Sequence, residues 1–113
     1  MHRRADFARV RRDGRAKAGR HLLVSTLADP ALDGLRVGII TTRRVGKAHD
    51  RNRLRRQVRA IIQRHGGRIG EPRRFVVTVL RAGAASADFA ELERDWLAQA
   101  GRLGLIEPRP EPA

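Results

Sequence analysis

The segment from Gly46 to Arg64, GKAHDRNRLRRQVRAIIQR, restricts the possible folds more than any other part of this chain. Its large apolar residues recur at helical spacing and predict a helix over residues 49–64 with one face on a hydrophobic core: Leu54, Val58, Ile61 and Ile62. Gly66 and Gly67 are expected to end this helix. The fold must therefore bury one side of a helix that carries six arginines after Asp50 and no further acid.

Apolar runs on both sides of this helix predict strands. HLLVSTL (21–27) and LRVGIITT (35–42) are joined by the turn-rich segment ADPALDG, and RFVVTVL (74–80) follows the helix. The run at 35–42 is apolar on both faces, which is typical of a central strand. The run at 74–80 is predicted to be a buried strand as well.

A helix is predicted near each end of the chain. Residues 3–13 place Phe7 and Val10 on one side, and Gly14 is the expected stop. Ser86 is expected to cap a last helix with one apolar stripe: Phe89, Leu92, Trp96, Ala100 and Leu103. The element order α-β-β-α-β-α predicts an α+β fold, a compact α/β sandwich with helices packed on a small sheet.

Length and composition favour one domain without disulfides. A chain of 113 residues suits a single modest core, so we expect a domain over residues 1–104 and a disordered, proline-rich tail over 105–113. Cysteine is absent, which excludes disulfides and thiolate zinc sites. No apolar run reaches the roughly 20 residues of a membrane span, and the first residues lack the apolar segment of a secretory signal. We therefore expect no membrane partner and a cytoplasmic location.

The charge balance indicates a polyanionic partner. The formal net charge is +13 and the pI is about 11.9. Repulsion among these positive charges destabilises the compact state unless a polyanion is nearby, and nucleic acid is the commonest polyanion in a cell. Polar and basic residues cover the side of the 49–64 helix opposite its stripe: Asn52, Arg55, Arg56, Arg59 and Gln63. A solvated face is the plain alternative for such a run. Solvated faces usually mix signs, however, and this helix offers only Asp50 as an acid.

The first turn of this helix gives a second reason to expect a phosphate-containing partner. Arg51 and Arg53 lie where cations oppose the helix dipole by roughly 0.3–1 kcal/mol each. Helix N-termini and arginines both attract phosphates. The charge pattern therefore favours nucleic-acid binding over a purely structural role.

The residues KAHDRNRLRRQVR resemble the RNR signature of the bacterial ribonuclease P protein family. The pattern is Lys, three residues, Arg-Asn-Arg, one residue, two basic residues, two residues and Arg. It is matched here by Lys47, Arg51, Asn52, Arg53, Arg55, Arg56 and Arg59. RADFARV is similar to the family's first helix, and LRVGIITTRRVGKA to the strand before its RNR helix, so the resemblance covers roughly residues 4–103.

The resemblance implies a fold and a task. The fold would be an α/β sandwich like a ribosomal-protein domain, with a left-handed β-α-β crossover against the usual right-handed rule. The chain would be the protein subunit of ribonuclease P, an endonuclease that removes the 5′ leader of precursor tRNA. The RNA subunit would carry catalysis with bound Mg²⁺, and the protein would bind no cofactor itself.

Two groups of residues are implied to bind RNA. The first would contact the catalytic RNA: Arg43, Arg44, Lys47, Arg51, Asn52, Arg53, Arg55, Arg56 and Arg59. The second would hold the leader of precursor tRNA in a cleft between the first helix and the sheet: Phe7, Arg11, His21, Leu23 and Ser25.

The cleft is where this chain departs from the family. Arg11 and Ser25 stand where the family commonly has aromatic residues, so base stacking is expected to be weak. Arg11 could instead stack its guanidinium or pair with a phosphate. Phe7 has an alternative role as a core residue beside Val10. By strand alternation His21 and Leu23 share one face, but the sequence leaves open which face forms the cleft floor.

The sequence argues against a nuclease site in the protein itself. A two-metal site needs clustered carboxylates, and residues 34–70 contain only Asp50. Asp88, Glu91 and Asp95 lie close together on the last predicted helix, where they flank the apolar stripe, so no metal site is expected. The histidines are scattered and lack an evident catalytic partner: His2, His21, His49 and His65.

Two other functions share parts of this pattern. A structural RNA-binding protein of ribosomal type would fit the composition, and co-purification with ribosomal subunits would distinguish it. A DNA-binding helix-turn-helix protein needs a helix and a tight turn directly before Asp50, and the chain lacks both. We therefore expect no DNA partner.

Overall fold

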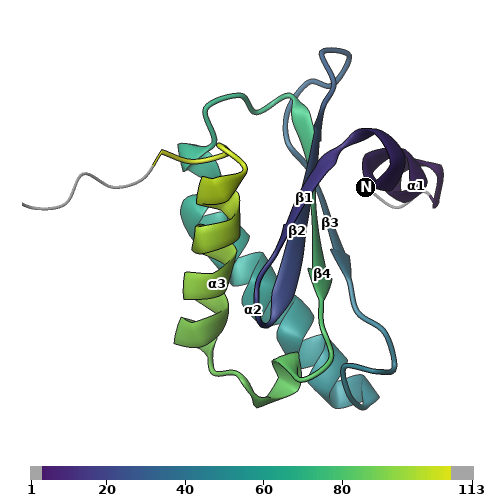
Figure 1. Ribbon diagram of the computed structural model, residues 1–113, viewed down its shortest axis with the longest axis vertical. Coiled ribbons are helices and arrows are strands. Elements are labelled where there is room, and N and C mark those ends of the chain that lie inside the picture. The colour runs from purple at the N-terminus through teal and green to yellow at the C-terminus, as the bar shows by residue number, and fades with distance from the viewer. Residues whose placement is uncertain (1–3, 108–113) are drawn as a thin grey trace, which may run out of the picture.

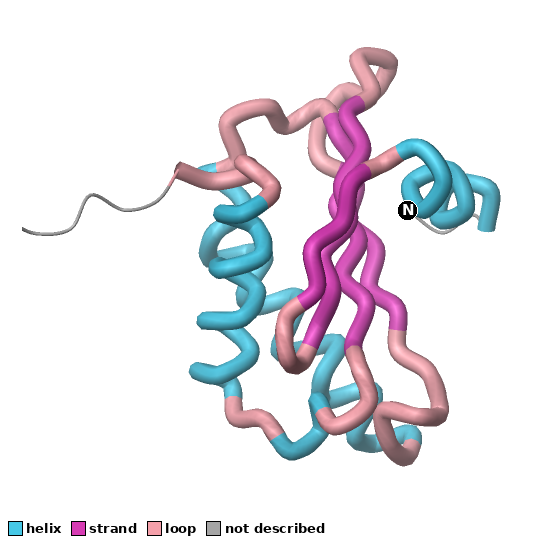
Figure 2. Tube along the Cα trace, in the orientation of Figure 1, coloured by secondary structure: helices cyan, strands magenta, loops and turns pink. Residues whose placement is uncertain are grey.

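The computed structural model describes residues 4–107. The described strands form one twisted mixed sheet in the order β1 (Arg15–Ala18), β2 (Leu22–Ala28), β4 (Arg74–Leu80) and β3 (Arg36–Ile40) (Figure 2). The helices are α1 (Arg4–Asp13), α2 (Ala48–His65) and α3 (Phe89–Arg102), with short 3-10 turns η1 (Gly66–Arg68) and η2 (Ala84–Ser86). Figure 1 shows α2 and α3 on one face of the sheet and α1 on the other. The predicted α+β sandwich is confirmed.

The strand pairing combines antiparallel and parallel neighbours. β1 pairs antiparallel with β2, and β2 pairs antiparallel with β4. β3 runs parallel to β4, and α2 connects these two strands. In Figure 1 both strands run downward, α2 lies to the left of the sheet, and β4 is nearer the viewer than β3. The connection is therefore left-handed, as the resemblance implied.

The larger core lies between the sheet and the two helices α2 and α3. Leu54, Val58 and Ile61 of α2 are fully buried there, together with Leu92 and Trp96 of α3. The indole Nε1 of Trp96 donates a hydrogen bond to Thr78 Oγ1 of β4 at 3.1 Å, so the polar end of this large side chain is satisfied inside the core. The predicted apolar stripes of both helices are confirmed.

A smaller cluster on the opposite face holds α1 against the sheet. Val10 is buried against Phe75 and Val77 of β4, with Phe7 half-buried beside them. Arg9 adds a polar anchor, because its Nη1 lies 2.8 Å from Asp29 Oδ2. This cluster secures α1 over only part of the sheet face.

The structure contains one strand more than predicted. β1, with the sequence RAKA, is exposed along its whole length, so its residues carry none of the apolar signal that the prediction used. The described order is therefore α-β-β-β-α-β-α. The prediction that the 35–42 run is a central strand was also wrong, since β3 lies at an edge of the sheet. It is apolar on both faces because α2 covers one and α1 the other, with Ile39 packed in the larger core and Ile40 in the smaller cluster.

The start of α3 differs from the prediction as well. Asp88, and not Ser86, caps the helix: its carboxylate accepts a hydrogen bond from Glu91 N at 2.8 Å, and Glu91 Oε1 accepts one from Asp88 N at 3.5 Å. This reciprocal pair is a capping box. Ser86 instead ends η2.

The packed chain continues beyond the predicted domain boundary at residue 104. Leu105 and Ile106 are buried in the larger core. Residues 108–113, which make up most of the predicted tail, lie outside the described residues. Within residues 4–107 no helix combines the length and apolar content needed to cross a bilayer.

Candidate nucleic-acid interface

The first turn of α2 is organised by Asp50. The backbone N of Lys47 donates to Asp50 Oδ2 at 3.3 Å, while Asp50 Oδ1 lies 3.3 Å from His49 Nε2 and 3.7 Å from Arg53 Nη1. Gly46, at φ 154°, precedes this turn, and a Cβ there would meet the Asp50 side chain. The single acid of the basic segment thus stabilises the helix start and offers no counter-charge to Arg55, Arg56 or Arg59.

Two arginines of α2 point toward η2 and α3, where they have partners within the protein. Arg53 Nη2 donates to the carbonyl oxygen of Ala85 at 2.9 Å. Arg64 Nη1 lies 2.8 Å from Glu93 Oε2, and its guanidinium lies over the Phe89 ring at 5.4 Å. Arg53, one of the predicted RNA-binding residues, therefore also holds the fold together.

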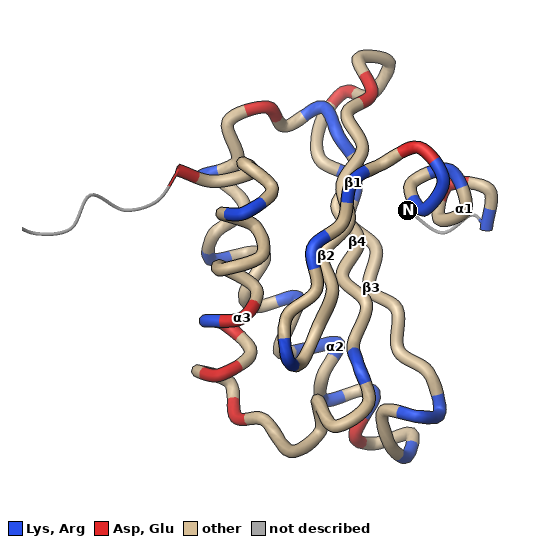
Figure 3. The backbone as a smooth tube through the Cα atoms, in the orientation of Figure 1, with Lys and Arg blue, Asp and Glu red and all other residues tan. Residues whose placement is uncertain are grey.

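The other arginines of α2 have no acidic partner among residues 4–107: Arg51, Arg55, Arg56 and Arg59. Arg55 Nη1 donates to Asn52 Oδ1 at 3.0 Å, which orients the guanidinium without neutralising it. A shallow depression on the outside of α2 is lined by His49 and by four residues of the predicted motif: Asn52, Arg55, Arg56 and Arg59. Arg43, Arg44 and Lys47 are exposed in the segment that leads into the helix. Figure 3 shows acidic residues gathered along α3 instead.

A second candidate site is a cleft of about 850 Å³ between α1 and the uncovered part of the sheet. Phe7 and Arg11 of α1 form its wall, and Leu23 and Ser25 of β2 lie on its floor. The register continues this floor across the neighbouring strands through Ala16, Ile40, Val77 and Val79. The face of β2 that carries Leu23 and Ser25 therefore forms the floor of this cleft, while the alternate residues Leu22 and Val24 point into the larger core.

Arg11 is the cation of this cleft that has no hydrogen bond or ion pair within the described part of the chain. The neighbouring Arg12 donates two hydrogen bonds of 3.1 Å to the Asp13 carboxylate, which raises the pKa of Arg12 and lowers that of Asp13. On the aliphatic floor, Ser25 offers a hydroxyl with no hydrogen bond inside residues 4–107. The site therefore combines an apolar floor, one ring and one available guanidinium.

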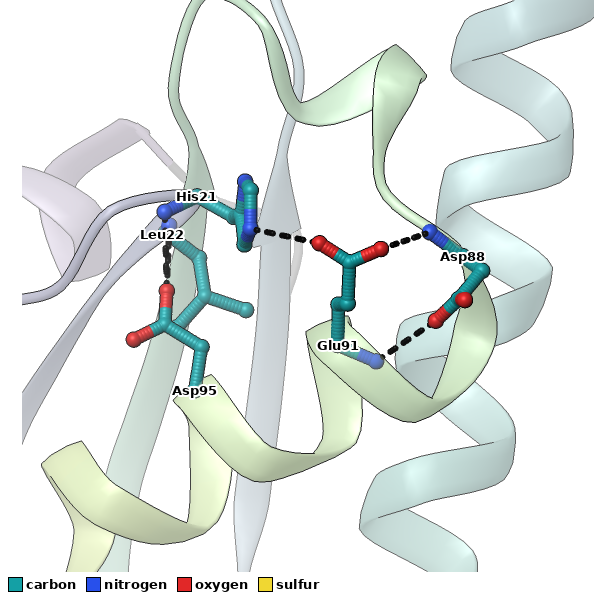
Figure 4. Close-up of polar contacts among 5 residues, drawn as sticks. All are labelled: His21, Leu22, Asp88, Glu91 and Asp95. Atoms are coloured by element: carbon teal, nitrogen blue, oxygen red, sulfur yellow. Dashed lines mark hydrogen bonds and ion pairs between the residues drawn. The ribbon is translucent and has the colours of Figure 1, made fainter.

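His21 does not belong to this cleft, which corrects the prediction. Its Nε2 lies 3.6 Å from Glu91 Oε2 on α3, and its backbone N donates to Asp95 Oδ2 at 2.8 Å (Figure 4). Leu22 N donates to the same carboxylate oxygen at 3.2 Å. Strand alternation fails for His21 because residue 21 lies in the β1–β2 turn, before β2 begins, and Asp95 holds this turn against α3.

The same contacts account for the acidic residues of α3. Asp88 and Glu91 form the capping box, and Asp95 binds the β1–β2 turn while its Oδ1 accepts a hydrogen bond from Gln99 Nε2 at 3.0 Å. Glu93 accepts a hydrogen bond from His65 Nε2 at 3.0 Å. Within the described residues, no three His, Asp or Glu side chains are grouped so that they could hold a metal ion. These carboxylates therefore serve the fold.

Comparison with known proteins places the chain in a family. The model of the Ribonuclease P family matches residues 1–104. The chain belongs to the ribonuclease P protein family. It is 34% identical over 101 residues to the ribonuclease P protein component of Syntrophomonas wolfei, with 89% of this chain and 83% of that protein covered. It is 39% identical over 104 residues to the one from Acidothermus cellulolyticus, with 91% and 86% covered. The Thermus thermophilus component is 40% identical over 101 residues, but the chain spans only 57% of it.

Solved structures of ribonuclease P proteins share this fold. The Staphylococcus aureus RNase P protein aligns with a TM-score of 0.86 at 21% identity and covers 95% of this chain and 96% of its own. The RNase P protein from Thermotoga maritima, in complex with 1-(4-fluorophenyl)-2-thiourea, aligns with a TM-score of 0.79 at 29% identity, with 95% and 99% covered. The ribonuclease P protein is one component of a tRNA-processing ribonucleoprotein, so an RNA is its partner in the holoenzyme.

Proposed function

We propose that this chain binds the catalytic RNA of ribonuclease P through the outside of α2 and the 5′ leader of precursor tRNA through the cleft beneath α1. The arrangement of the α2 arginines carries the proposal. Those that face η2 and α3 have partners within the protein, whereas Arg55, Arg56 and Arg59 have no acidic partner among the described residues. A phosphate backbone supplies the missing negative charge.

The cleft suits a single strand of RNA. Its floor is built from aliphatic side chains on which a base can lie, Phe7 offers one ring for stacking, and Arg11 stands at the rim for a phosphate. With a single ring available, backbone contacts dominate and the preference for particular leader bases is weak.

The hydrolysis itself is assigned to the RNA subunit, with Mg²⁺ bound by that RNA. A metal-dependent phosphodiesterase needs clustered carboxylates. In residues 4–107 the carboxylates of α2, of α3 and of the α3 cap are engaged in caps, ion pairs and hydrogen bonds instead: Asp50, Asp88, Glu91, Glu93 and Asp95. This engagement supports a protein that positions RNA and leaves the chemistry to its partner.

Reconstitution with the host's catalytic RNA tests the proposal. The protein should lower the dissociation constant of precursor tRNA more than that of mature tRNA, and the difference should shrink as the leader is shortened stepwise. An equal effect on both tRNAs, with the holoenzyme assembled, would show that the protein acts only by stabilising the RNA subunit. Failure to bind the catalytic RNA at all would favour the ribosomal-type alternative.

A further inference from the structure

A second groove lies at the outer edge of β3 and adjoins the cleft beneath α1 at Phe7. Phe7 lines both hollows. The other walls of the second groove come from β3 and α2 and include Val37, Ile39, Arg55, Arg59 and Ile62. β4 is the neighbour of β3 in the described sheet, so the outer backbone edge of β3 is free to hydrogen-bond within the groove.

Arg55 and Arg59 stand between this groove and the outside of α2. They are four residues apart and therefore one turn apart on the same side of the helix, where the pitch is about 5.4 Å. Both line the groove at the β3 edge and also the outer depression. Arg56 lines the outer depression and does not line the groove. The basic surface of α2 thus has two sides: Arg55 and Arg59 belong to both, and Arg56 belongs to the outer one alone.

We propose that the leader leaves the cleft past Phe7 and crosses the β3 edge, where Arg55 and Arg59 bind its phosphates. The assignment rests on the proposed function, because it extends the path of the same strand. It gives these two arginines a substrate role in addition to their contact with the catalytic RNA, and it leaves Arg56 with the catalytic RNA alone.

The shape and charge of the groove favour single-stranded RNA as its occupant. None of the residues that line it is acidic, and two are unneutralised arginines above an aliphatic strip. The path also turns from one face of the sheet to the other, since α1 and α2 lie on opposite faces (Figure 1). A double helix is too stiff to follow such a turn, as the persistence length of about 50 nm of duplex DNA illustrates, whereas a single strand bends freely.

Arg59 and Arg56 form a matched pair for the test. Both are exposed, they lie three positions apart on α2, and neither has a hydrogen bond or ion pair in the described part of the chain. Arg59→Ala and Arg56→Ala would each be reconstituted with the catalytic RNA. A titration of each variant against the RNA first gives the protein concentration at which all of the RNA is bound, and that concentration is then used. Dissociation constants would then be measured for precursor and mature tRNA.

We expect Arg59→Ala to raise the dissociation constant of precursor tRNA by roughly tenfold relative to mature tRNA, as the loss of one charge-assisted hydrogen bond predicts. Arg59→Lys should recover part of this loss, because the charge is kept. Arg56→Ala should weaken assembly with the catalytic RNA yet keep the wild-type ratio of the two tRNA affinities. Thermal melting of each variant checks that the fold is intact.

The outcomes separate the two proposals. If both alanine variants keep the wild-type ratio while the wild-type protein still prefers precursor tRNA, the groove assignment is overturned and the proposed function stands. If the wild-type protein itself shows no preference for precursor tRNA, the proposed function fails, and the groove assignment fails with it.

Discussion

The guanidinium of Arg53 donates a hydrogen bond to the carbonyl oxygen of Ala85, 2.9 Å away, and so ties α2 to η2. The side chain is about two-fifths exposed and lies 3.7 Å from Asp50 as well. An arginine in the middle of the RNR motif therefore serves the fold, which distinguishes it from Arg55, Arg56 and Arg59.

Arg53→Ala should lower the free energy of unfolding by about 1 kcal/mol, because the Ala85 carbonyl loses its side-chain donor. Arg56→Ala, at an exposed position without a partner in the described residues, should stay within about 0.5 kcal/mol of wild type. Urea denaturation of both variants measures the difference. Equal stabilities would mean that the Arg53–Ala85 contact contributes nothing to folding.

Single alanine substitutions of Arg55, Arg56 and Arg59 should weaken binding to the catalytic RNA and flatten its salt dependence. Each lost phosphate contact removes about one unit from the slope of log K against log salt concentration. The fold should be unaffected, because the buried side of α2 is formed by Leu54, Val58 and Ile61. Binding titrations over a series of salt concentrations give the slopes, and unchanged slopes would restore the interpretation as a solvated face.

Phe7→Ala and Arg11→Ala should each raise the dissociation constant of precursor tRNA while mature tRNA binding stays nearly constant. If Phe7 stacks on a leader base, its loss corresponds to on the order of 1–3 kcal/mol. Phe7 is half-buried beside Val10, so its removal also opens space in the α1 cluster, and the stability of this variant must be measured in parallel. Arg11 is exposed and provides the cleaner comparison. A uniform loss for both tRNAs in Arg11→Ala would count against leader contact in the cleft.

Two carboxylates make the fold sensitive to acid. The backbone N–H of Ala31 and the side chain of Arg9 lower the pKa of Asp29, and a hydrogen bond from His65, with help from Arg64, lowers the pKa of Glu93. A folded-state pKa below the unfolded value contributes stability above the unfolded pKa of about 4, and this contribution is lost as the pH falls through the folded pKa.

Stability should therefore decline as the pH falls below about 4. Asp29→Asn and Glu93→Gln should be less stable than wild type at neutral pH and should lose less on acidification. Denaturant melts between neutral and acidic pH measure this, and variants that lose as much stability in acid as wild type would refute the assignment.

Sequence periodicity predicted those parts of the fold that depend on local pattern. The stripes of α2 and α3 and the strand at 74–80 are visible because burial repeats at helical or strand spacing. β1 has no such pattern: Lys17 and its neighbours are small or charged, and they are extended because they pair with β2, opposite Val24 in the case of Lys17. The sequence contains the capping box of α3 as Asp88 and Glu91, so the prediction of a cap at Ser86 was wrong.

The candidate site was predictable only in part, because some of its geometry depends on contacts between residues far apart in the sequence. The resemblance grouped Phe7, Arg11, Leu23 and Ser25, and the structure brings them into one cleft. His21 was misplaced because its orientation depends on Asp95, which lies far along the chain. The groove that joins Phe7 to Arg59 depends on the edge position of β3, and the order of strands in a sheet is a tertiary property that no local pattern carries.

The separation of the two apolar clusters has a dynamic consequence for the cleft. α1 contributes one buried residue, Val10, to the smaller cluster, while the larger core lies entirely on the other face of the sheet. Lifting α1 from the sheet breaks this smaller cluster and the Arg9–Asp29 pair but not the larger core, so it requires less free energy than global unfolding. A shift of α1 against the sheet would change the width of the cleft while leaving the larger core on the other face intact. If the cleft holds the leader as proposed, part of the binding free energy would go into holding this wall in place.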